Sequence, residues 1–231
     1  MKTLTNTDKE FVCDIEAPCF QALSPEEIEA IKSSRIQVFF HKGENLTKQG
    51  VFATFVLFVT KGFVKQHVEG DGQHKVNLRI VGQGEFLGLS SAFDHPRFLY
   101  SSVALTEAQA FLIEKDTIIQ MIKQNGTFAY NIMRRYCAQT EGLFNLIKNQ
   151  SYKQINGRMA DTLLYMQPAN FNGEDVTALL TRRDIAEFAG VSMESAVKIL
   201  KAFEKDGLLK LDEKQIIILQ PDALAEISKR G

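Results

Sequence analysis

The chain has 231 residues, enough for two domains with their own cores. Its 27 basic and 28 acidic residues nearly cancel, and the part from Ser151 onward holds 11 basic and 12 acidic residues. This balance excludes a protein that coats nucleic acid through a general positive charge. Any DNA binding must therefore depend on local geometry.

The N-terminal region lacks the apolar core of a signal peptide, and the longest apolar run, 55–59, is too short to cross a membrane. We therefore expect a cytoplasmic protein without a membrane partner. Three cysteines do not make a disulfide framework in a chain of this length. Cys13 and Cys19 are either inert or ligands of a metal centre, but they cannot supply four thiolates within one subunit.

A change of hydrophobic period divides the first half of the chain. Ser24-Pro25-Glu26-Glu27 combines a capping serine, a proline at the first helical position and a returning glutamate, which predicts a helix to about Ser33. From Arg35 the period is two, and glycines separate short strands. The predicted strands are 36–40, 55–59, 63–68, 76–81, 102–105 and 110–113. Such a series predicts an antiparallel roll or barrel.

A short helix from Asp116 or Thr117 is predicted to end at Asn125-Gly126, and 127–149 forms one long helix. Its apolar positions follow a 4-3 spacing, which is typical of a coiled-coil seam: Ala129, Met133, Tyr136, Thr140, Leu143 and Ile147. The alternative is a helix buried against its own roll. We favour a homodimer, and predict domains at 1–126 (sensor), 127–150 (dimerisation helix) and 151–231, with a polar hinge at 151–156.

The stretch 180–209 has the signals of a helix-turn-helix. Thr181 and Asp184 form a capping box for a helix over Arg182–Ala189, and Gly190 allows a tight turn. Ser192 caps a second helix over Met193–Lys205. Residues 208–211 and 215–219 flank a turn at 212–214 and predict a β-hairpin, so the unit is a winged helix-turn-helix.

The second helix has one apolar stripe, formed by Ala196, Ile199, Leu200 and Phe203. Its other face offers side chains that can contact base edges in a major groove. Carboxylates accept from cytosine N4, ammonium groups donate to guanine, and apolar groups touch thymine methyls. The predicted DNA-binding residues are Thr181, Arg182, Arg183, Ser192, Met193, Glu194, Val197, Lys198 and Lys201. Arg182 and Arg183 are expected to meet phosphates. The alternative, a helical hairpin in an unrelated core, is disfavoured by the wing.

The run LTRRDIAEFAGVSMESAVKILK at 180–201 resembles the signature of the CRP/FNR superfamily of bacterial transcription regulators, and 157–164 resembles its lead-in helix. The resemblance covers about 24–219 in family order. It implies an α+β chain with an N-terminal antiparallel β-roll of the cyclic-nucleotide-binding type, a long dimerisation helix and a C-terminal winged helix-turn-helix. It also implies double-stranded DNA and RNA polymerase as partners.

The resemblance places an effector pocket in the roll, with candidate residues Phe86, Gly88, Leu89, Ser90, Ser91, Tyr100 and Ser101. In relatives that bind cyclic AMP, a glutamate holds the ribose and an Arg-Ser pair holds the phosphate. Here Leu89 stands in place of that glutamate and Tyr100-Ser101 near the Arg-Ser pair. A buried phosphate without its cation is costly. We therefore predict that cyclic AMP does not bind in the family manner.

Three alternatives for the pocket stay open. It takes an apolar or aromatic ligand against Phe86, Leu89 and Tyr100, it is filled by its own side chains, or it holds haem. The histidines available for haem are scattered through strands and loops, at His41, His67, His74 and His95. No cofactor is assigned with certainty, and no dedicated metal site is predicted.

The leading hypothesis is thus a dimeric transcription regulator. An enzyme is disfavoured because no H-x-H spacing or nucleophile–base pair appears, and a nucleotide-binding module without DNA is disfavoured by the wing. Family members that read TGTGA-like half-sites often have arginine where Met193 and Lys198 stand, with a glutamate retained here as Glu194. Methionine cannot donate to guanine, and lysine lacks the guanidinium fork, so looser base discrimination is expected.

Overall fold

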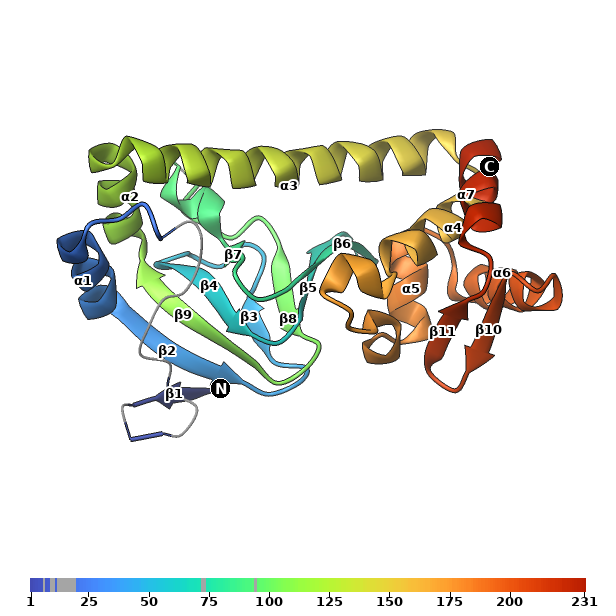
Figure 1. Ribbon diagram of the computed structural model, residues 1–231, viewed down its shortest axis with the longest axis horizontal. Coiled ribbons are helices and arrows are strands. Elements are labelled where there is room, and N and C mark those ends of the chain that lie inside the picture. The colour runs from blue at the N-terminus through green and yellow to red at the C-terminus, as the bar shows by residue number, and fades with distance from the viewer. Residues whose placement is uncertain (6, 9–10, 12–19, 72–73, 94) are drawn as a thin grey trace. The chain divides into compact units, whose positions relative to one another are not determined.

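The computed structural model describes residues 1–5, 7–8, 11, 20–71, 74–93 and 95–231 (Figure 1). Cys13 and Cys19, considered above as metal ligands, lie outside the described residues. Contacts divide the chain into two compact units, Met1–Glu69 with Arg79–Glu141 and Gly70–Leu78 with Gly142–Gly231. Among the described helices, none has the length and apolar character needed to cross a membrane.

Two antiparallel sheets make up most of the first unit, although residues 75–78, at the start of β6, are grouped with the second unit. The five-stranded sheet has the order β1-β2-β9-β4-β7, with strands Lys2–Leu4, Arg35–Phe40, Ala108–Glu114, Phe55–Lys61 and Phe86–Leu87. The four-stranded sheet has the order β3-β8-β5-β6, with strands Asn45–Thr47, Ser101–Ala104, Val64–Glu69 and Lys75–Val81. All six predicted strands are confirmed, with ends shifted by one or two residues. The strands that were missed, β1, β3 and β7, are too short to show a period.

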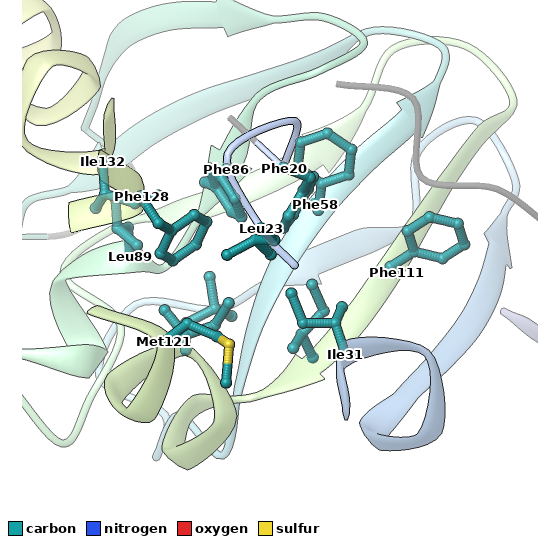
Figure 2. Packing of buried hydrophobic residues seen from close by; sticks show 13 residues of the cluster. Phe20, Leu23, Ile31, Phe58, Phe86, Leu89, Phe111, Met121, Phe128 and Ile132 are labelled. Carbon is teal, nitrogen blue, oxygen red and sulfur yellow. The ribbon is translucent and has the colours of Figure 1, made fainter. Parts of the chain in front are cut away.

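Both faces of the larger sheet are covered by other parts of the unit, which explains why strands β4 and β9 are apolar on both sides. One face packs on the smaller sheet, and Leu57 and Ala110 belong to a core that also contains Val64 and Ala104. The other face carries Phe58, Phe86 and Phe111 into a second core (Figure 2). Burial on both faces produces nearly continuous apolar runs rather than strict alternation.

Helices cover that second face. They are α1 (Pro25–Ser34), α2 (Lys115–Gln124) and the first turns of α3 (Gly126–Tyr152), which contribute Ile31, Ile118, Met121, Phe128 and Ile132 to the core. The capping box predicted for α1 is present: Ser24 Oγ accepts from the Glu27 amide at 3.3 Å, and the Glu27 carboxylate accepts from the Ser24 amide at 2.8 Å.

Asn125 joins the start of α3 to α1. Its Oδ1 accepts from the Phe128 amide at 2.9 Å, and its Nδ2 donates to the Glu27 carboxylate at 2.9 Å. The break between helices is shorter than the predicted hinge at 151–156, because α3 continues to Tyr152 and only residues 153–154 precede α4 (Ile155–Tyr165). No glycine or proline interrupts 151–152, and the Lys153 amide still donates to the Asn149 carbonyl at 3.1 Å.

In the second unit, α4 packs against α5 (Arg182–Ala189), α6 (Met193–Lys205) and α7 (Pro221–Arg230). The wing consists of β10 (Leu209–Asp212) and β11 (Gln215–Ile218), and short 3-10 turns occupy Pro168–Phe171 and Val176–Leu179. The sequence reasoning missed α7, although Pro221 at its first turn and Lys229 and Arg230 in its last turn are ordinary helix signals.

Candidate functional site

Local hydrogen bonds set the ends of both helices of the helix-turn-helix. Thr181 Oγ1 accepts from the Asp184 amide at 3.1 Å, and the Asp184 carboxylate accepts from the Thr181 amide at 2.8 Å. Gly190 ends α5 with φ +61°, and a Cβ there would lie 3.1 Å from the Gln150 side chain. Ser192 caps α6 by accepting from the Ser195 amide at 3.1 Å. The predicted bounds of α5 and α6 agree with the structure residue for residue.

The inner side of α6 is buried. Ala196, Ile199, Leu200 and Phe203 all belong to the core, where α6 contacts α4, α5 and β10. Burying each of the three larger side chains contributes about 1.5–3 kcal/mol. These residues therefore determine the rotation of α6 about its axis.

The outer face of α6, formed by Met193, Glu194, Val197, Lys198 and Lys201, is left at the surface. Val197 is half-buried and the other four are exposed. The pKa of Glu194 is lowered by hydrogen bonds from its own amide and from Ser192, and by the positive charge of Lys198. The carboxylate is therefore ionised near neutral pH, where it can act only as a hydrogen-bond acceptor.

Arg182 and Arg183 were both expected to meet phosphates, but in the structure each already has a partner within the chain. The Arg182 guanidinium donates to the carbonyl oxygens of Glu213 at 3.2 Å and Lys214 at 3.4 Å, at the tip of the wing. Burial lowers the pKa of Arg182, although a guanidinium keeps its charge. Arg183 is exposed and pairs with Glu187 at 3.1 Å. Arg182 thus ties α5 to the wing, a role that only the folded chain shows.

Further contacts hold the wing on the helices. The Ile216 amide donates to Thr177 Oγ1 at 3.1 Å, and the Leu211 amide donates to the Glu204 carboxylate at 2.8 Å. Glu213, in the turn between the strands, has φ +49°. The hairpin is therefore anchored from both strands as well as from its tip.

The structure does not bring the seven candidate effector residues together. Phe86 and Leu89 are buried among Phe20, Phe58 and Phe128 in the core under the helices (Figure 2). Gly88 and Tyr100 do meet, because the Gly88 amide donates to Tyr100 Oη at 2.8 Å. The Ser91 hydroxyl donates to the Gly88 carbonyl at 2.7 Å. Ser90, the residue before Ser91, is also buried.

Ser101 belongs to a separate polar cluster on the smaller sheet. Its hydroxyl donates to the Glu69 carboxylate at 2.7 Å, and Lys48 Nζ donates to the same group at 2.6 Å. These hydrogen bonds, that from Lys48 foremost, lower the pKa of Glu69 to about 2. His67 is buried with its Nε2 3.4 Å from Glu69. Within the described part of the chain, no group of three or more metal-ligating side chains gathers.

Two polar residues beside Tyr100 escaped the sequence reasoning. Arg79 Nε donates to Gln66 Oε1 at 2.7 Å, and Arg79 Nη1 forms an ion pair with Glu85. The pKa of Tyr100 is raised because burial of the phenol outweighs the hydrogen bonds and the charge of Arg79. The available signal was an arginine in the otherwise apolar run Leu78–Val81.

The six residues predicted for the dimer contact form a stripe on α3. Met133, Tyr136, Leu143 and Ile147 are exposed by 55%, 40%, 42% and 60%, whereas Ala129 and Thr140 are half-buried. Phe128 and Ile132, on the other side of the helix, fill the core of the first unit. Large apolar side chains are thus present on both sides of α3.

Comparison with known proteins agrees with this architecture. Residues 37–125 match the family model of a cyclic nucleotide-binding domain, and residues 157–227 match that of a Crp-like helix-turn-helix domain. The chain belongs to the CRP/FNR superfamily of transcriptional regulators. Its fold is the one expected from the sequence, with an antiparallel N-terminal sheet domain, a long helix and a C-terminal helix-turn-helix. Members of this family are regulators rather than enzymes.

Individual relatives are distant but nearly full-length. A CRP-like cAMP-activated global transcriptional regulator of Mycobacterium tuberculosis is 24% identical over 214 residues, which is 90% of this chain and 95% of that one. The anaerobic regulatory protein of Bacillus subtilis is 22% identical over 203 residues, 85% of each chain. The solved structure of the c-di-GMP responsive regulator CLP of Xanthomonas campestris has a TM-score of 0.74, with 18% identity over 84% of this chain and 99% of that one.

We predict that Arg182→Ala loosens the wing of this CRP/FNR protein. Loss of the charged donor to two tip carbonyls is expected to raise hydrogen exchange of a 208–219 peptide about fivefold. The matched control is Arg183→Ala, which removes an exposed guanidinium that does not contact the wing tip. Hydrogen exchange measured by mass spectrometry tests this, and equal exchange in the two variants contradicts the anchoring role.

Proposed function

We propose that the protein is a homodimeric, sequence-specific DNA-binding transcription regulator, gated by a signal sensed in the N-terminal roll, with RNA polymerase as a further partner. The observation that carries this proposal is the division of α6 into a buried inner side and a solvent-facing outer face. A helix presented in this way fits a major groove, and the Ser192 cap sits at the end that recognition helices direct toward the bases.

The outer face also supports a particular mode of readout. Glu194 is an ionised acceptor that suits cytosine N4, and Lys198 is a donor that suits guanine. Met193 is an apolar group for a thymine methyl. Thr181, Arg183, Ser192 and Lys201 lie on exposed turns and helix surface, where phosphate contacts would position the helices without reading sequence.

A dimer is supported by the α3 stripe. Four large apolar side chains repeat at 4-3 spacing on the exposed side of the helix, which is the pattern of a two-helix seam. Pairing through this seam gives the protein twofold symmetry. A dimer of helix-turn-helix units then requires two half-sites one helical turn, or a multiple of it, apart on the DNA.

The roll supports a sensor that does not use cyclic AMP in the family manner. Leu89, which stands where the resemblance places a ribose-binding glutamate, packs in the apolar core and has no hydrogen-bonding group to offer. Tyr100 Oη already accepts from the Gly88 amide. The effector of this chain is therefore proposed to differ from that of its cAMP-activated relatives.

We predict that Glu194→Ala and Lys201→Ala weaken DNA binding in different ways. On an operator selected from a random duplex library, Glu194→Ala is expected to cost about 1–3 kcal/mol and to abolish the preference at one half-site position. Lys201→Ala is expected to weaken operator and scrambled duplex alike and to reduce the salt slope by about one. Fluorescence anisotropy against a panel of single-base operator variants measures both. Equal losses from Glu194→Ala on every duplex contradict base readout.

We also predict that charges in the α3 stripe separate the subunits. The double variant Met133→Glu/Ile147→Glu would bury carboxylates in the seam, so its mass by light scattering is expected to fall to the 26.0 kDa of one chain. The control Ala138→Glu/Asn145→Glu adds the same charge at exposed positions outside the stripe and is expected to stay dimeric. A monomeric wild-type protein, with or without operator, contradicts the proposal.

A further inference from the structure

One basic side chain in the interior of the first unit has an unused hydrogen-bond donor. Arg79 lies on β6, with a side chain only 21% exposed. Its Nε is satisfied by Gln66 and its Nη1 by Glu85. Its Nη2 is buried and has no hydrogen-bond partner among the described residues. A buried donor on a charged group is costly to leave unpaired, so such a position favours an acceptor that binds from outside.

The carboxylate that pairs with Arg79 is poorly buried. Glu85 lies in the turn between β6 and β7, and its side chain is 38% exposed. Its carboxylate occupies one nitrogen of the Arg79 guanidinium, and it is the more exposed partner of the pair. If the Arg79–Glu85 salt bridge had only a structural role, it would explain the pairing of Nη1. It would not explain why Nη2 is buried without a partner.

The groups around Arg79 fit an oxyanion. Gln66 is buried, and Tyr100 lies close enough for the charge of Arg79 to act on its phenol. Tyr100 Oη accepts from the Gly88 amide, and its phenol also hydrogen-bonds with the Gln66 side chain. A guanidinium, a carboxamide and a phenol together make a donor-rich site for a carboxylate or a phosphate.

α3 contacts the chain at two points between residues 84 and 93, one of them next to Glu85. Arg135 of α3 donates to the Gly84 carbonyl at 2.7 Å, next to Glu85. The ring of Tyr136, a member of the α3 stripe, lies 6.4 Å from that of Phe93. A shift of Glu85 would therefore act on the helix that is proposed to form the dimer.

We propose that Arg79 is the effector-binding residue of the roll, and that the effector is a small organic anion, a carboxylate or a phosphate, which displaces Glu85 from Arg79. This inference rests on the proposed function as a gated regulator, and it names the class of signal. Displacement frees Glu85, and the turn at 82–85 then passes the change to Arg135.

Isothermal titration of the full-length protein tests this with three probes: benzoate, inorganic phosphate and cyclic AMP. Glu85→Gln removes the competing carboxylate, so it is expected to bind at least one probe about tenfold more tightly than the wild type. Adding Arg79→Met to that variant is expected to abolish the gain, and adding Arg79→Lys to remove most of it, because an ammonium lacks the planar guanidinium fork that presents two donors side by side. The probe that binds distinguishes a carboxylate from a phosphate source.

The matched control adds Arg97→Met, which removes an exposed arginine of the same unit that donates to the Gly50 carbonyl, and it is expected to retain the gain. Binding that is independent of Arg79, or the absence of binding of all three probes to Glu85→Gln, overturns the inference. Operator binding of each variant is measured separately without any probe. If the wild type binds its operator but Glu85→Gln binds no anion, only this inference is contradicted. If the wild type binds no operator at all, the proposed function is contradicted.

Discussion

The burial of one side of α6 is the constraint on which the rest of the account depends. Because Ala196, Ile199, Leu200 and Phe203 pack into the second unit, the helix cannot rotate without exposing several large apolar side chains. That exposure would cost about 1.5–3 kcal/mol for each larger side chain. The chemistry offered to DNA is thus a consequence of packing, and it needs no overall positive charge.

The same dependence of function on packing holds in the roll. Phe58 and Phe111 point from the larger sheet toward helices, and Phe128 and Ile132 of α3 close that core (Figure 2). A helix held in this way leaves the large apolar side chains of its opposite side exposed to solvent. Buried polar groups in this unit are mostly paired, and Arg79 combines an unpaired buried Nη2 with a full positive charge.

Elements with local signals were predictable from the sequence, and long-range contacts were not. The caps at Thr181 and Ser192 and the turn at Gly190 act within a few residues, so both helix ends agree with the structure. The contact of Arg182 with the carbonyls of 213–214 was not predicted, because nothing local reveals that the wing folds back onto it. Arg79 and Gln66 meet only through strand pairing, and α7 was overlooked although its signals are local.

Site-directed DNA cleavage tests the central claim most directly. The chain is first prepared with serine in place of Cys13, Cys19 and Cys137. An iron chelate is then attached at Ala202→Cys. Ala202 is an exposed residue of α6, one turn beyond Lys198. The account predicts two patches of major-groove cleavage about one helical turn apart within the operator. The same chelate on Asp222→Cys of α7 is expected to cut elsewhere or weakly. A single patch, or no cleavage from α6 inside a protected operator, would contradict both the assigned outer face and the dimer.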